Sequence, residues 1–124
     1  MRRFFSLFVL FVVLSSCENH IAIEAITKAN ELLQEKPDSA LMIIRQLDTN
    51  TIHSAKWKAR YALTKATALD KNFIDTTDAS FLHSAEHFFS RYGTPEEKMK
   101  FHYYVGRIQF NSMLQTTPMP LYRL

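Results

Sequence analysis

The sequence predicts an all-α fold, and three observations support this prediction. The 124 residues include only two glycines and four prolines, fewer than the many turns of a sandwich or barrel would require. Apolar residues recur every three or four positions along most of the chain, which is the spacing of one face of a helix. No segment alternates apolar and polar residues over the length of a strand. We therefore expect about five helices joined by short loops.

The N-terminal segment has the composition of an export signal rather than of a folded domain. Positive residues precede an apolar run at residues 4–14, which only Ser6 interrupts. This run is shorter than the roughly 20 residues of a membrane-spanning helix, but it has the length of a signal-peptide core. Leu-Ser-Ser-Cys at residues 14–17 resembles a lipobox, in which the cysteine is acylated after cleavage. We expect residues 1–16 to be a lipoprotein signal peptide and residues 17–20 a lipid-anchored N-terminus.

Cys17 is the only cysteine in the chain, which excludes an intramolecular disulfide and a cysteine-based zinc site. A lone cysteine in an exported protein is explained by lipid attachment, and the alternative is a chance cysteine after an ordinary signal peptide. Each buried CH₂ of an acyl chain contributes about 0.8 kcal/mol, so several chains would hold the protein firmly. We expect lipid on Cys17 to anchor the protein in the cell envelope, at the outer rather than the inner membrane. The sequence leaves open whether it faces the periplasm or the cell surface.

The positive charge of the chain owes much to this signal. Loss of Arg2 and Arg3 lowers the count of Lys and Arg from 15 to 13 against 12 acidic residues, so the net charge falls from +3 to +1. No basic patch of the kind that binds nucleic acid then remains. We therefore expect no nucleic-acid partner.

Residues 21–115 are predicted to form one domain of helical repeats. A first apolar stripe indicates a helix at about residues 21–36, which Pro37 interrupts. A second, short helix is expected at residues 40–47, followed by a polar loop at residues 48–54.

The third predicted helix, residues 55–71, is apolar on two sides. Trp57 and Tyr61 lie roughly opposite the stripe that contains Ala59, and a helix of this kind usually packs on both sides. The alternative is that the two aromatic rings form an exposed patch that binds a partner. Asn72 is expected to end the helix, because asparagine tolerates the left-handed conformation.

The fourth helix is expected at residues 81–92, with Gly93 as its C-terminal cap. The start of the fifth helix carries the clearest local signal in the chain. Thr94, Pro95 and Glu97 have the spacing of a capping box with proline at the first helical position. The residues predicted to face inward on this helix are Phe101, Tyr104, Val105 and Ile108.

These patterns together resemble tetratricopeptide repeats, which are helix-turn-helix units of 34 residues. Val105-Gly106 matches the hydrophobic-glycine pair of a unit's first helix. The second helix of a unit is matched by Ala25, Ala29, Leu32 and Pro37. More specifically, residues 36–41, 59–63, 68–72 and 103–108 are similar to a group of lipid-anchored tetratricopeptide proteins of Gram-negative anaerobes. The resemblance implies a protein-binding or scaffolding role.

The chain departs from this family near its end. Gln109 stands where the family favours tyrosine, and Pro118 stands where a small residue is expected. With Pro120 close behind, a further helix should not form, because proline in a helix interior costs about 3 kcal/mol. We expect residues 116–124 to be an irregular tail of a short or truncated member, with the fifth helix partly uncovered.

One motif suggests metal chemistry. His83-Ser84-Ala85-Glu86-His87 matches the H-x-x-E-H signature of one class of zinc proteases. Both imidazoles are predicted to face solvent, opposite the apolar stripe, and few residues follow that could supply a third ligand. Adventitious zinc or nickel on His83 and His87 is the alternative. No glycine-rich phosphate loop or nucleophile-elbow motif is present, so we expect neither an enzyme nor a cofactor.

Two functions fit these observations. The first is a lipid-anchored module that binds another envelope protein or peptide. The alternative is a ligand- or glycan-binding accessory lipoprotein for nutrient uptake. Trp57 and Tyr61 distinguish the two, because both rings exposed in one groove would form a glycan platform, whereas burial would remove it. The sequence leaves the oligomeric state open.

Overall fold

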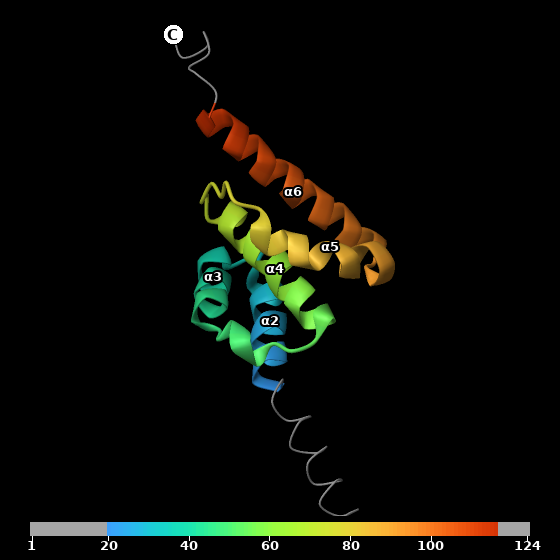
Figure 1. Ribbon diagram of the computed structural model, residues 1–124. Helices are drawn as coiled ribbons and strands as arrows, with labels where there is room; N and C mark the ends of the chain where they lie inside the picture. Colours follow the sequence, from blue (N-terminus) through green and yellow to red (C-terminus); the bar gives the residue numbers. More distant parts are fainter. Residues whose placement is uncertain (1–19, 117–124) are drawn as a thin grey trace, which may run out of the picture.

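The computed structural model describes residues 20–116, which fold into five α-helices and one 3₁₀ turn without a strand. The all-α prediction is confirmed, and the arrangement is that of a short, repeat-like helical solenoid (Figure 1). The predicted signal peptide, Cys17, Pro118 and Pro120 lie outside the described residues. No helix between residues 20 and 116 is long and apolar enough to cross a membrane. The elements are α2 (His20–Leu32), α3 (Pro37–Gln46), η1 (Thr49–Thr51), α4 (Ala55–Lys71), α5 (Ser80–Tyr92) and α6 (Pro95–Thr116).

Helix α4 lies at the centre of the molecule, with α2 and α3 on one side and α5 and α6 on the other (Figure 1). Its two-sided packing, predicted from the sequence, is confirmed. Ala59 and Ala66 are buried against α5 and α6, whereas Ala68 is buried against α2 and α3. Small side chains on α4 allow both neighbouring helix pairs to approach it closely.

A hydrogen bond recurs in successive helix pairs. The side-chain amide of Asn72, after α4, donates to the carbonyl of Pro37 at the start of α3, at 2.8 Å. The amide of Asn111, in α6, donates to the carbonyl of Thr76, just before α5, at 3.2 Å. The two asparagine donors are 39 positions apart, and so are the two carbonyl acceptors. The α3–α4 pair and the α5–α6 pair are therefore each joined by an equivalent hydrogen bond. This equivalence supports the description as a repeat.

The first helix ends earlier than predicted, at Leu32 rather than near Lys36. Pro37 begins α3 and forces the preceding Lys36 out of the helical region, to φ −136° and ψ 66°. The chain therefore turns over residues 33–35 before α3 begins. Proline suits this first helical position, because it has no N–H group to leave unpaired.

Asn72 ends α4 as predicted, but the residue in the left-handed conformation is the following one, Phe73. Asn72 has φ −94°, whereas Phe73 has φ 59° and a side chain 93% exposed. The amide of Phe73 donates to the carbonyl of Asp70 and that of Ile74 to the carbonyl of Leu69, both at 3.0 Å. This is the Schellman pattern, and it moves the positive φ one residue further along the chain.

The prediction that Gly93 is the C-terminal cap of α5 is confirmed, and the cap has an extended conformation with φ −66° rather than a left-handed one. A Cβ atom at this position would lie 2.7 Å from the carbonyl oxygen of Phe89. Glycine is required there by close approach of the backbone and not by its φ. The capping box that follows is confirmed: the Thr94 amide donates to Glu97 Oε2 at 2.9 Å, and the Glu97 amide donates to Thr94 Oγ1 at 3.1 Å.

Helix α6 has 22 residues and extends through Thr116. The predicted tail began at that residue, so the boundary moves by one position, and residues 117–124 are not described. Phe101, Tyr104 and Ile108 are buried as predicted, whereas Val105 is only partly buried. The far half of α6 is held by Asn111 and by Arg107, whose Nε donates to Asp70 at 2.9 Å.

Candidate functional site

A groove of 340 Å³ lies between α2, α4 and the first turns of α6, and we refer to it as the α4 groove. Its volume is within the range of about 300–1,000 Å³ that is typical of ligand sites. Three helices that are distant in sequence therefore contribute to one concave surface. Its lining residues on α2 are Ile26, Thr27 and Asn30. The remaining lining residues are Trp57, Arg60, Leu63, Thr64 and Thr67 of α4, and Thr94, Glu96, Glu97 and Lys100 at the start of α6.

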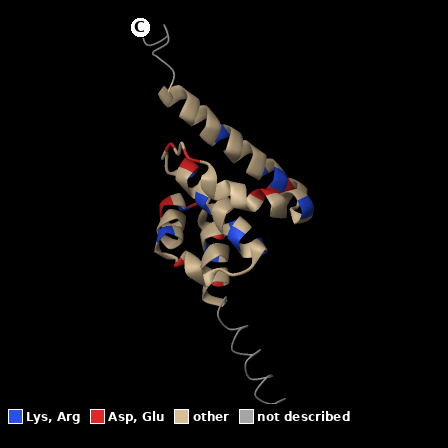
Figure 2. Cartoon of the chain, viewed as in Figure 1, with Lys and Arg blue, Asp and Glu red and all other residues tan. Residues whose placement is uncertain are grey.

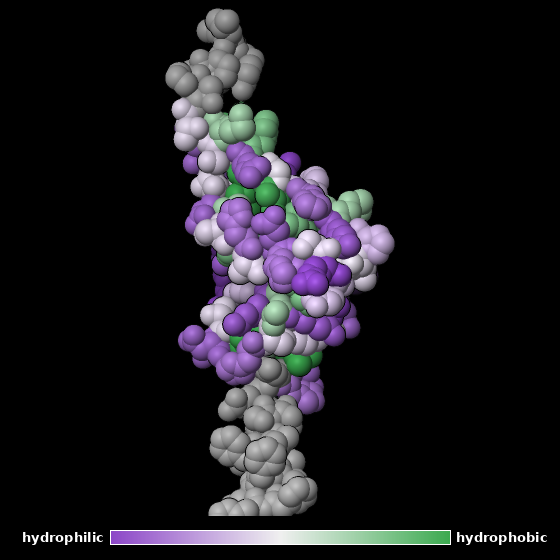
Figure 3. Space-filling view, turned by 45° about the vertical axis from the view of Figure 1, so that its right-hand side comes forward, coloured by the Kyte–Doolittle hydropathy of each residue, from purple (hydrophilic) through white to green (hydrophobic). Residues whose placement is uncertain are grey.

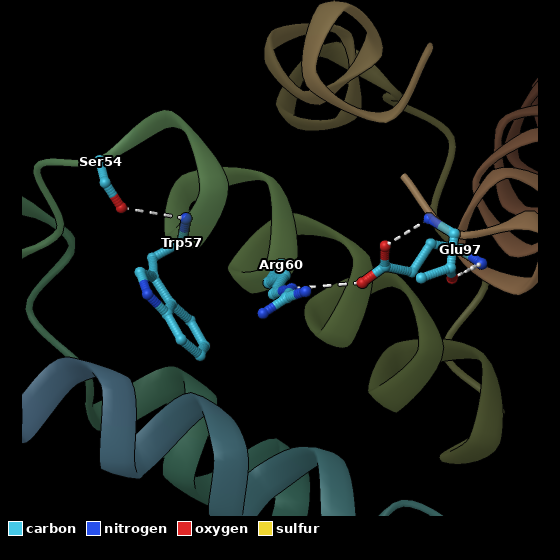
Figure 4. Close-up of polar contacts among 5 residues, drawn as sticks. Ser54, Trp57, Arg60 and Glu97 are labelled. Carbon is cyan, nitrogen blue, oxygen red and sulfur yellow. Dashed lines mark hydrogen bonds and ion pairs between the residues drawn. The ribbon is translucent and has the colours of Figure 1, made fainter. Parts of the chain in front are cut away.

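A chain of polar contacts holds one rim of this groove (Figure 4). One oxygen of Glu97 accepts the Thr94 amide in the capping box. The other oxygen accepts Arg60 Nε at 3.2 Å, across 37 residues of sequence. The Arg60 guanidinium also lies 5.2 Å from the centre of the Trp57 ring, which is within the range of a cation–π contact. The same carboxylate thus caps α6 and positions the arginine beside the aromatic ring.

Trp57 forms the apolar wall. Ser54 caps α4 by accepting the Trp57 amide at 3.2 Å, which fixes the first turn of the helix. The indole is half-buried and packs against the cluster formed by Ala22, Ile26 and Ile52. Figure 4 shows the ring between α4 and α2.

Two buried threonines form the polar floor. The Thr67 hydroxyl donates to the Leu63 carbonyl at 2.8 Å. Thr64 is only 4% exposed, yet its hydroxyl forms no hydrogen bond with another residue in the described part of the chain. A buried hydroxyl without a partner costs about 1–3 kcal/mol. A hydrogen bond from a bound molecule to the Thr64 hydroxyl would therefore remove this cost and stabilise the complex.

The charges of the groove neutralise one another. Besides the Arg60–Glu97 pair, Lys100 Nζ lies 2.8 Å from Glu96 Oε1. The hydrogen bond and charge of Lys100 lower the pKa of Glu96. With two cations and two anions paired, the groove favours an uncharged ligand over an anion or a cation.

The structure separates the two aromatic residues that the sequence grouped. Trp57 lines the α4 groove, whereas Tyr61 lines a different depression with Ile52 and Phe81. Both rings are half-buried against the same cluster, and burial raises the pKa of Tyr61. They do not form a platform exposed in one groove.

Sequence reasoning did not identify Arg60, Thr64 or the second role of Glu97. The capping box located Glu97 at a helix start, but nothing local indicated a contact with Arg60. The burial of Thr64 also depends on how α2 packs against α4. No local sequence pattern therefore predicted the Arg60–Glu97 contact or the burial of Thr64.

The two histidines of the H-x-x-E-H motif, His83 and His87, are both exposed on α5. Between residues 20 and 116 there is no group of three or more side chains that could hold a metal ion. Catalytic zinc normally requires three protein ligands.

Comparison with protein-family models, curated proteins and solved structures gives no match to this chain.

Proposed function

We propose that the protein is a lipid-anchored envelope module that binds an uncharged segment of another protein in the α4 groove. The observation that supports this proposal is the groove itself, which combines an apolar ring, a buried hydroxyl and paired charges. An extended peptide offers apolar side chains to such a wall and backbone amides to such a floor. The tetratricopeptide resemblance points to the same class of function.

Membrane attachment is the second part of the proposal. Cys17 is three residues from His20, the first residue of α2, so the chain between them spans at most about 11 Å. Lipid on Cys17 would hold α2, one wall of the groove, close to the membrane surface. The partner is then a protein of the same envelope.

Site-specific photocrosslinking in cells tests the groove. A photoreactive amino acid replaces Thr27, an exposed residue of the groove wall, and a matched control replaces His87, an exposed residue of α5. We expect one envelope protein to crosslink at position 27 and not at position 87. The adduct should disappear when Arg60→Ala and Trp57→Ala are combined. Equal adducts at both positions, or none at position 27, would overturn the proposal.

The membrane anchor is tested separately by labelling cells with palmitate. The native chain should incorporate the label, and Cys17→Ser should not. Retained labelling in this variant would show that lipid attachment at Cys17 is wrong, and it would leave the groove proposal intact.

A second candidate is a neutral glycan. The two-ring platform does not form, so a sugar would bind against the single Trp57 ring and the neutral floor of the groove. Sugars combine an apolar face with hydroxyl groups, and these groups complement the indole and Thr64. Trp57 is the only tryptophan, so its fluorescence reports on the groove directly. A saturable change with cellobiose that is lost in Thr64→Val would support the glycan. No change with cellobiose would exclude this sugar and favour the peptide.

A further inference from the structure

Helix α6 carries a second apolar face, on the side opposite to its buried residues. Its four large residues are between 54% and 66% exposed, and Leu114 beside them is half exposed. Together with Gly106 at the middle of the series, these four residues are spaced by four, three, four and three positions, which is the heptad pattern of helices that pair with other helices. We call this face the outer stripe, and it consists of Met99, Tyr103, Gly106, Phe110 and Met113.

Gly106 is not required by the fold of the chain itself. Apart from the neighbouring backbone of α6 itself, a Cβ atom at this position would have no heavy atom within 4 Å, unlike at Gly93. Glycine in a helix interior is unfavourable, and alanine would be a better residue if only α6 had to form. A glycine on an exposed face allows the backbone of a second helix to approach closely. Its place at the centre of the outer stripe indicates a helix crossing there.

The outer stripe is nearly symmetric about Gly106. One methionine lies seven residues before it and one seven residues after it, and an aromatic residue lies three before and four after. The order methionine, aromatic, glycine, aromatic, methionine is therefore the same in both directions. An antiparallel second α6 would place Met99 against Met113 and Tyr103 against Phe110 of the other copy. This self-complementarity is the property of a twofold interface between identical chains.

Charge and area also fit a second copy. Arg107 is the only charged residue in positions 101–116, and it already pairs with Asp70. Figure 2 shows the resulting uncharged length of α6, and Figure 3 shows apolar surface toward its C-terminal end. Half-exposed side chains of this size bury on the order of 100 Å² each, or roughly 500 Å² per copy with Leu114. The total of about 1,000 Å² reaches the lower limit for a specific interface.

We propose that the protein forms an antiparallel dimer through the outer stripe, with α6 crossing α6 at Gly106. The groove residues Glu97 and Lys100 lie on other faces of α6, so both α4 grooves stay open. Attachment of both copies to one membrane would raise their effective concentration and favour an interface of modest area. The dimer does not depend on what the α4 groove binds.

Cysteine crosslinking of the full chain in its native envelope tests the orientation. Differently tagged chains carrying Met99→Cys and Met113→Cys are co-expressed and oxidised with copper phenanthroline. The two positions are about 21 Å apart within one helix, beyond the reach of a disulfide, so any bond joins two copies. We expect mixed 99–113 dimers to exceed 99–99 and 113–113 dimers at least fivefold. The native chain and Glu86→Cys, on α5, are the controls. Equal crosslinking in all combinations, or none, would overturn the proposal.

Substitutions then separate association from folding, with the oligomeric state measured by sedimentation. Phe110→Ser and Gly106→Ala should each raise the dimer dissociation constant at least tenfold, whereas Gln109→Ser, outside the stripe, should leave it unchanged. Gly106→Ala should at the same time raise the Tm of the dilute monomer, so loss of the dimer cannot come from misfolding. If the native chain were monomeric and dimerised only after removal of residues 117–124, those residues would be the natural occupant of the outer stripe. That result would overturn the proposal.

Discussion

Helices α4 and α6 are the two longest of the described helices, and both are apolar on two sides, but their two sides have different surroundings. The 17 residues of α4 include seven buried ones, most of them small, because helices pack on both of its sides. The 22 residues of α6 include three buried ones, and its opposite side carries large exposed side chains. Position in the solenoid explains the contrast, since α4 is central and α6 is the last described helix. An apolar face is therefore evidence of a core only when another element covers it.

The largest effect should come from two phenylalanines on opposite sides of α6. Phe101 is buried and its ring centre lies 5.6 Å from that of Phe89, whereas Phe110 is exposed. Phe101→Ala should lower the free energy of unfolding by about 3–5 kcal/mol. Phe110→Ala should change it by less than about 0.5 kcal/mol when the protein is dilute enough to be monomeric. Urea denaturation of both variants measures the difference, and similar losses would contradict the contrast between the two sides.

A smaller effect is expected from enlarging a residue on α4. Ala68 is fully buried between α4 and the α2–α3 pair, so Ala68→Leu should cost roughly 1–3 kcal/mol through overpacking. Gln109→Leu, at an exposed position of α6, is the matched control and should be nearly neutral. Thermal unfolding compares the two. If Ala68→Leu were tolerated as well as the control, α4 would not be tightly packed on its second side.

The two glycines of the chain should respond to alanine with opposite signs. Gly93→Ala places a methyl group against the carbonyl of Phe89 and should cost roughly 1–3 kcal/mol. The methyl group of Gly106→Ala would contact no other helix, so this substitution should stabilise the monomer by about 0.5–1 kcal/mol, because alanine is the better helix former. Chemical denaturation at low protein concentration gives both values. Changes of the same sign would mean that local crowding does not distinguish the two positions.

The smallest effect concerns pH at the start of α6. Lys100 lowers the pKa of the exposed Glu96, so the folded state favours the ionised carboxylate. A lowered pKa contributes stability above the usual range of a glutamate, and this stability is lost as the pH falls through the lowered value. Native protein should therefore lose slightly more stability than Glu96→Gln between pH 7 and pH 3. Urea midpoints at both pH values test this, and an identical pH dependence in the two proteins would contradict it.

Much of the fold followed from local sequence. The Ser54 cap of α4 and the capping box of Thr94 and Glu97 act on groups within four residues of themselves, so the starts of α4 and α6 could be predicted from the sequence. Helix α3 begins at Pro37, three residues before its predicted start. Helix ends were less accessible. The turn after α4 places its positive φ at Phe73, where the hydrogen bonds of the Schellman pattern outweigh the steric preference for asparagine or glycine.

The sequence by itself determined the helical class, most helix starts, the two-sided packing of α4 and the motif around Cys17 that predicts the anchor. Tertiary structure alone decided that Arg60 forms an ion pair with Glu97, that Thr64 is buried in the groove that Trp57 also lines, and that Tyr61 lies apart from that groove. It also decided that the stripe centred on Gly106 is exposed. The physical reason is range. Caps and periodicity act over a few residues, whereas a groove depends on side chains about 30 to 40 positions apart, which only the packing of whole helices brings together.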